Sequence, residues 1–184
     1  MNAAHYHLIV NHLPIFSTLF GLLILLWGIF RANPSIKNIA YILLVVGAIS
    51  GYVAMETGES AEDIVEEQSI ASHDLIHEHE EAAEIAFWFT IITGVLSLVC
   101  LFNPNLNPRY QKTLTGAILL SALIALGTLT YTAYEGGKIS HPEAYGTQGQ
   151  VGSLVTEYEY LSSMSRGDDL LQPGKQGRNN LNNT

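Results

Sequence analysis

Histidine and carboxylate side chains are crowded into residues 73–84, directly before an apolar run. The segment HDLIHEHEEAAE holds three histidines and five acidic residues, and IAFWFTIITGVLSLVCLF follows it. Imidazole and carboxylate groups bind transition metals, and imidazoles also serve as axial ligands of haem iron. His73 and His77 are four residues apart, so on a helix they share one face and suit a single metal ion. The same residues equally suit a helix end in water, because the helix dipole favours acidic residues in the first turn.

The elements that position these side chains are four apolar runs, at approximately residues 14–30, 38–56, 82–102 and 113–134. A helix needs about 20 apolar residues to span the membrane core. Charged residues make up only 14% of the 184, against about 25% in soluble domains. We therefore predict an all-α integral membrane four-helix bundle over residues 1–143. Residues 144–184 are predicted to form a polar tail, disordered alone or docked on a partner.

The loops between the runs predict the orientation of the bundle. RANPSIKN and NPNLNPRYQK each hold two basic residues and no acidic one, whereas residues 56–84 hold no Lys or Arg. The positive-inside rule places both short basic loops in the cytoplasm, and both termini with the acidic loop on the periplasmic side. Gly58 and Ser60 predict a helix end and a new N-cap, so a short surface helix is expected between spans two and three. The net charge of −9 argues against a nucleic-acid partner, which needs a basic face.

Small residues recur along one face of each span, and the third of these stripes predicts where His79 points. Ser72 is a suitable N-cap for a helix that runs from residue 73 to about 102. On that helix, the stripe extended back by one turn reaches His79, whereas His73 and His77 lie on another face. Small residues allow close helix packing, and they would equally leave room for a flat cofactor. The stripe consists of Ala83, Ala86, Thr90, Gly94 and Ser97.

Other ionisable side chains reach the same depth under this topology. Glu135 continues the small-residue stripe of the fourth span, three residues after Thr132. Ionisable side chains at membrane depth are costly and tend to be functional, so their convergence predicts a site at the periplasmic boundary. His5 and His7 are interpreted as interfacial polar groups without a ligand role. The candidate metal ligands are His12, His79, His141, Glu59, Glu62, Glu80 and Glu135, with His73 and His77 as further candidates.

Four segments of the chain, NHLPIFSTLFGLL, TGESAED, HEEAAEIA and GGKISHPE, resemble a family of small four-helix bacterial membrane proteins of unknown function. The first helix of that family opens with a His-x-Pro-Ile motif, and the resemblance covers roughly residues 8–143. In related members the domain stands beside or is fused to redox modules such as Rieske-type iron–sulfur domains. The resemblance implies a multi-pass protein of the bacterial inner membrane. The positions that it marks are His12, Pro14, Gly58, Glu59, Glu62, His79, Glu80, Gly136, Gly137 and His141.

Three functions are compatible with these residues. The favoured one is a membrane electron-transfer subunit, rather than a stand-alone enzyme, in which His12 and His79 bind haem b axially and His141 is a substitute ligand. Its acidic face would then dock a basic periplasmic electron carrier. The second is a non-haem site for iron, copper, zinc or manganese, which uses the carboxylates as ligands. The third is a cofactor-free scaffold subunit of a larger membrane complex.

Overall fold

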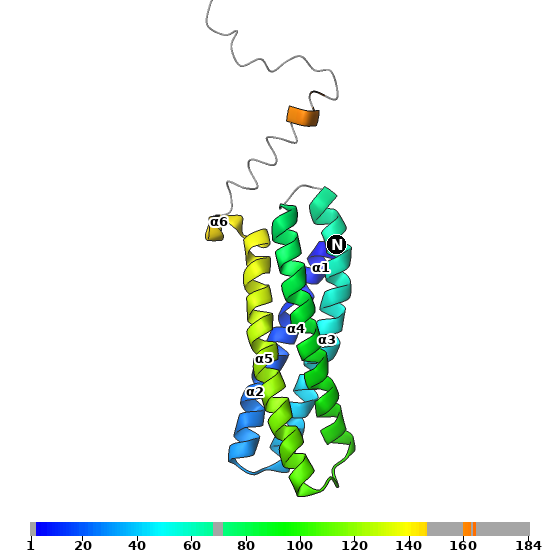
Figure 1. Ribbon diagram of the computed structural model, residues 1–184, viewed down its shortest axis with the longest axis vertical. Helices are drawn as coiled ribbons and strands as arrows, with labels where there is room; N and C mark the ends of the chain where they lie inside the picture. The colour runs from blue at the N-terminus through cyan, green and yellow to red at the C-terminus, as the bar shows by residue number, and fades with distance from the viewer. Residues whose placement is uncertain (1–2, 68–71, 147–159, 163, 165–184) are drawn as a thin grey trace, which may run out of the picture.

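Four long helices form an elongated antiparallel bundle, and two short helices adjoin one of its ends (Figure 1). The computed structural model describes residues 3–67, 72–146, 160–162 and 164, so most of the predicted polar tail lies outside the described residues. Each long helix packs on its two neighbours, in the cyclic order α2, α3, α4, α5. The helices are α1 (Ala3–Val10), α2 (His12–Phe30), α3 (Pro34–Glu67), α4 (His73–Phe102), α5 (Pro108–Ser140) and α6 (Pro142–Tyr145).

The prediction of an all-helical fold with four helices of membrane-spanning length is confirmed for the described residues. The segments long and apolar enough to cross a membrane are His5–Phe30, Pro34–Glu62, His73–Phe102 and Pro108–Ser140. The longest has 33 residues, about 50 Å at 1.5 Å per residue, so the helices extend beyond a membrane core of about 30 Å. The two short basic loops lie at one end of the bundle. The other end holds α1, the end of α3, the start of α4 and the end of α5 (Figure 1), and we call it the histidine end.

Polar side chains begin two of the long helices, and the sequence predicts the first of these N-caps. Ser72 is the N-cap of α4, and its Oγ accepts a hydrogen bond from the Leu75 N–H at 3.4 Å, as predicted. Asn107 does the same for α5, where its Oδ1 accepts from the Arg109 N–H at 2.9 Å. Pro108 then occupies the first turn, where a missing N–H leaves no hydrogen bond unmade. Local sequence therefore determines where α4 and α5 start.

The predicted helix break at Gly58 is wrong, because α3 continues without interruption to Glu67. A glycine inside a helix destabilises it by only about 1 kcal/mol, which packing readily offsets. A Cβ atom at Gly58 would lie 3.2 Å from Cε1 of His7, so the bare backbone makes room for that ring. Ser60 donates to the Glu56 carbonyl at 3.1 Å instead of capping a new helix. The expected short surface helix is therefore the last part of α3.

The first span also begins earlier than the predicted start at Pro14. Residues His5–Phe30 form one span, in which α1 and α2 are separated only by a turn at Asn11. Pro14 explains the turn, because it has no N–H to donate to the carbonyl four residues earlier. The Asn11 N–H still donates to the His7 carbonyl at 2.9 Å. α1 packs against α3, so His7 lies within the span rather than before it.

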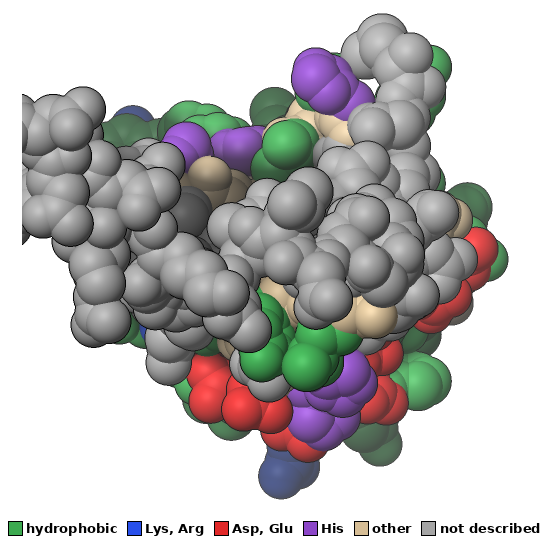
Figure 2. All heavy atoms as spheres, turned by 90° about the horizontal axis from the view of Figure 1, so that it is seen from above, with side chains coloured by type: hydrophobic (Ala, Val, Ile, Leu, Met, Phe, Trp, Pro, Cys, Tyr) green, Lys and Arg blue, Asp and Glu red, His purple; other side chains and the backbone are tan. Residues whose placement is uncertain are grey.

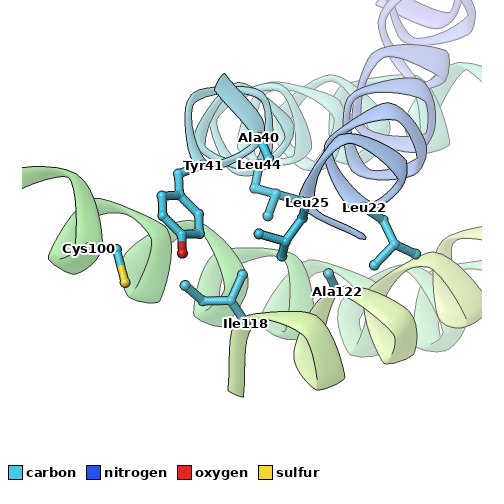
Figure 3. Close-up of a cluster of buried hydrophobic side chains, with 8 residues drawn as sticks. All are labelled: Leu22, Leu25, Ala40, Tyr41, Leu44, Cys100, Ile118 and Ala122. Carbon is cyan, nitrogen blue, oxygen red and sulfur yellow. The ribbon is translucent and has the colours of Figure 1, made fainter. Parts of the chain in front are cut away.

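The bundle interior combines apolar side chains with very close helix contacts. Eight buried side chains from α2, α3, α4 and α5 point toward one another in the half of the bundle near the basic loops (Figure 3). A Cβ atom at Gly94 would lie 2.4 Å from the Ala48 Cβ, so α3 and α4 touch at this point. The small residues therefore serve close packing here. The predicted stripe differs in α5, where Ala117 is exposed and Ile118 is buried instead.

Replacing Tyr41 with phenylalanine should lower the free energy of unfolding by about 0.5–1.5 kcal/mol, the usual net contribution of one hydrogen bond. The buried hydroxyls of Tyr41 and Thr115 are 2.8 Å apart and join α3 to α5. The measurement is thermal loss of helical circular dichroism in detergent. Tyr110→Phe is the matched control, because Tyr110 is exposed. Equal stability of the two variants would show that the buried hydrogen bond contributes nothing.

Candidate functional site

His79 is the one histidine of the charged segment that turns into the bundle. It is half-buried, whereas His73 and His77 are exposed, as the stripe of α4 predicts. Its Nδ1 lies 3.1 Å from the Thr132 carbonyl oxygen of α5. A Cβ atom at Gly136 would lie 2.9 Å from the ring, so the ring rests on the bare α5 backbone. His79 is therefore held against α5 by one hydrogen bond and one glycine contact.

The ring that faces His79 belongs to His7 of α1. The two ring centres are 6.4 Å apart, and the ring planes are inclined by 81°. His7 Nδ1 lies 3.0 Å from the Ala54 carbonyl oxygen of α3 and 3.4 Å from Thr57 Oγ1. Together with its contact at Gly58, His7 is seated on α3 much as His79 is seated on α5. His7, interpreted from the sequence as an interfacial polar group, therefore packs against α3 and is half-buried.

A signal for His7 is present in the sequence. The buried positions of the first span include Pro14, Thr18, Gly21 and Leu25, which are spaced by three or four residues. His7 precedes Pro14 by seven residues, or two helical turns, and so continues this face. The predicted span begins at Pro14, so this seven-residue spacing was not applied to His7. The missed element was α1, and with it the ligand candidate that α1 carries.

The imidazole rings of His7 and His79 both contact a backbone carbonyl through Nδ1. A backbone carbonyl can only accept a hydrogen bond, so the proton is on Nδ1 in His7 and in His79, by inference from these contacts. Nε2 of each ring then carries a lone pair, and within the described residues neither Nε2 has a hydrogen-bond partner. A hydrogen bond from the other ring nitrogen to a carbonyl is the usual arrangement of a metal-binding histidine. Nε2 is therefore the nitrogen of each ring that is left as an acceptor.

Asn11 adds a buried acceptor on the same side of the first span. It follows His7 by four residues, and its Oδ1 is buried without a hydrogen-bond partner among the described residues. An unsatisfied buried polar atom destabilises the fold by about 1–3 kcal/mol. Nothing in the types and spacing of the neighbouring residues distinguished Asn11 from an ordinary loop residue.

His12 and His141, the two other predicted axial ligands, both lie on the outside. The His12 ring stacks on Phe16, with ring centres 6.4 Å apart, and its Nδ1 is 3.2 Å from the Leu8 carbonyl oxygen. His141 is exposed at the end of α5, where its N–H donates to the Gly137 carbonyl at 2.8 Å. The expected pairing of His12 with His79 therefore gives way to His7 with His79. The reason is their spacing, because His12 is five residues after His7 and so lies on another face of the first span.

The predicted carboxylate ligands do not gather around these rings. Glu59 and Glu80 are exposed and Glu62 is half-buried. Within the described residues, no three His, Cys, Asp or Glu side chains are grouped closely enough to hold one metal ion. Glu135 is the exception in burial, with 2% exposure and Lys138 Nζ at 2.6 Å from its Oε2. Its burial agrees with its place on the small-residue stripe of α5.

His73 and His77 form a separate group on the surface of α4. Their ring centres are 6.3 Å apart. His77 also approaches two acids, with Nδ1 at 3.7 Å from Glu80 Oε2 and Nε2 at 3.3 Å from Glu81 Oε1. Figure 2 shows acidic and histidine side chains gathered along one edge of the histidine end. This group is exposed to solvent, as expected for a helix that extends beyond the membrane.

Comparison with known proteins identifies a family. The family described as "Predicted membrane protein (DUF2231)" matches residues 5–149. The chain therefore belongs to this family, which confirms the resemblance to membrane proteins of unknown function. No curated protein and no solved structure matches the chain.

Proposed function

We propose that this DUF2231 protein is a membrane electron-transfer subunit that holds haem b between His7 and His79. The observation that supports this function is the facing imidazole pair, with ring centres 6.4 Å apart. Two imidazoles that bind one ion from opposite sides, through nitrogens at about 2.0–2.1 Å, have ring centres roughly 6 Å apart. The distance between the two ring centres is close to this value, so His7 and His79 are the residues that would hold the group.

The number of converging ligands favours haem over a single ion. Two imidazoles face each other, and no group of three ligands occurs in the described part of the chain. A protein site for zinc or another transition metal usually supplies three or four ligands. Iron in a porphyrin already has four nitrogen ligands, so two axial histidines complete its coordination. The pair thus supplies the two protein ligands that haem iron requires, but fewer than the three or four that a metal ion without a porphyrin requires.

The chain's own residues would fix the geometry of this centre. Thr132 and Ala54 carbonyls hold the two Nδ1 atoms at 3.1 and 3.0 Å, which orients the rings and raises the basicity of Nε2. Bare backbone at Gly58 and Gly136 lets each ring lie against its supporting helix. When bound, haem would supply one-electron transfer. The four helices would then act as a rigid frame around the ligand pair.

The surroundings of the pair support exchange of electrons with a basic carrier. Exposed acids lie along one edge of the histidine end, among them Glu56, Glu59, Glu80 and Glu81. Acidic surfaces accelerate encounters with positively charged proteins at low ionic strength. The basic loops lie at the opposite end, so the positive-inside rule supports a periplasmic position for the haem and its carrier. The protein would then be a subunit of the inner membrane, beside other redox components.

The visible absorption spectrum of the purified protein tests this function. The chain is expressed with haem precursor in excess, extracted in mild detergent, and measured before and after reduction with dithionite. We expect a Soret band that shifts on reduction and a pyridine assay that gives about one haem b per chain. A stoichiometric metal without a Soret band would replace haem by a non-haem centre. Absence of both would leave the scaffold function.

A further inference from the structure

A groove lies on the outer side of the seam between α4 and α5. It has a volume of about 370 Å³ and opens to the surroundings of the bundle. One half is apolar and is lined by Ala82, Ile85 and Tyr131, of which Ile85 and Tyr131 are more than half exposed. These residues belong to the apolar runs of the two helices, so this half faces lipid chains.

The other half of the groove is charged and lies at the ends of the same apolar runs. It is lined by Glu78, Glu81, Glu135 and Lys138, three carboxylates and one ammonium, which gives a net charge of −2. Lys138 Nζ lies 3.7 Å from Glu78 Oε2. Glu81 is exposed beside His77. The groove therefore changes from apolar to acidic where the chain leaves the membrane core.

Glu135 forms the buried wall of the charged half. Its side chain is 2% exposed, and Lys138 Nζ lies 2.6 Å from its Oε2, so this carboxylate is ion-paired within the protein. Glu78 and Glu81 are exposed. Their carboxylates are therefore the hydrogen-bond acceptors that a ligand in the groove can reach.

We propose that this groove binds an aminophospholipid through its primary ammonium group. The groove is amphiphilic in the same order as a lipid, with an apolar half inside the membrane and a charged half at its boundary. The excess of carboxylates suits the ammonium of an ethanolamine headgroup, and Lys138 supplies a positive charge for its phosphate. Charge-assisted hydrogen bonds to carboxylates are about twice as strong as neutral ones.

The chemistry of the headgroup distinguishes this site from general lipid contact. Phosphatidylcholine has the same phosphate and net charge, but its trimethylammonium group has no N–H to donate. Phosphatidylglycerol lacks the cation and would meet the excess of carboxylates. The site should therefore prefer ethanolamine to choline by roughly tenfold, the factor that about 1.4 kcal/mol produces.

Lipid retention by the full chain tests the proposal. The protein is reconstituted in nanodiscs of equal parts phosphatidylcholine, phosphatidylethanolamine and phosphatidylglycerol with identical acyl chains. Native mass spectrometry after transfer to detergent then identifies the lipid that stays bound. We expect one phosphatidylethanolamine per chain. Equal retention of the choline lipid, or preference for the glycerol lipid, would overturn the proposal.

Matched variants assign the preference to the groove. Glu78→Gln with Glu81→Gln removes two of its carboxylate charges and should abolish the ethanolamine preference. Glu56→Gln with Glu84→Gln removes two exposed charges elsewhere on α3 and α4 and should leave the preference unchanged. Retained preference in the first double variant would overturn the assignment. The assay does not require haem, so its outcome is independent of the proposed redox function.

Discussion

Replacing His79 with alanine should abolish the Soret band of the purified protein, and replacing His7 should do the same. Each variant would remove one of the two histidines that we propose to hold haem. Loss of an outer-shell partner weakens metal affinity by about 10–100-fold, and loss of a ligand should exceed this. The haem-to-chain ratio from the pyridine assay gives the occupancy, with helical circular dichroism as the check on folding.

His12→Ala and His77→Ala are the controls for this result. Both side chains are exposed, and both should retain haem at the level of the unchanged protein. The comparison of His7→Ala with His12→Ala is the sharpest, because His12 is a ligand predicted from the sequence and His7 is a ligand in the proposed function. If His12→Ala lost the haem while His7→Ala kept it, the proposed ligand pair would be wrong.

Replacing Gly94 with leucine should destabilise the bundle more than any single surface change. A Cβ atom there would lie 2.4 Å from Ala48 Cβ, so even one added carbon forces α3 and α4 apart. Overpacking a well-packed interior usually lowers the free energy of unfolding by about 1–3 kcal/mol. The larger leucine should reach the upper end of this range. Thermal loss of helical circular dichroism in detergent measures the effect.

Gly127→Leu on α5 is the matched control, because a Cβ atom at Gly127 would meet no atom within 4 Å. Gly127 is exposed and lies within a span, where leucine is favourable in lipid. Its stability should stay equal to that of the unchanged protein. Equal melting of the Gly94 and Gly127 variants would contradict the close contact of α3 with α4.

The site shows how far periodicity alone can predict geometry. The small-residue stripe of α4 predicted correctly that His79 points inward, because a regular helix fixes the angle between side chains. The same reasoning brought Glu135 into the interior. It was not applied to His7, because the span was predicted to begin at Pro14. Counting back two turns from Pro14 reaches His7, whereas His12 is five residues after His7 and lies on another face.

Sequence by itself determined the class of this protein. The length and apolar composition of four runs predict membrane-spanning helices. The reason is that backbone N–H and C=O groups in lipid must form hydrogen bonds within their own segment. Ser72 and Asn107 mark the starts of α4 and α5 through local hydrogen bonds. These features depend on residues that are close together in the sequence, so the sequence alone predicts them.

Only the tertiary structure decided which side chains meet. Gly58 would end a helix in many contexts, but here His7 packs on its bare backbone and α3 continues. The facing of His7 and His79 joins residues 72 positions apart. Such contacts follow from the packing of whole helices, whose energy is spread over many side chains. The sequence shows that residues 7 and 79 are histidines, but only the fold brings their rings together.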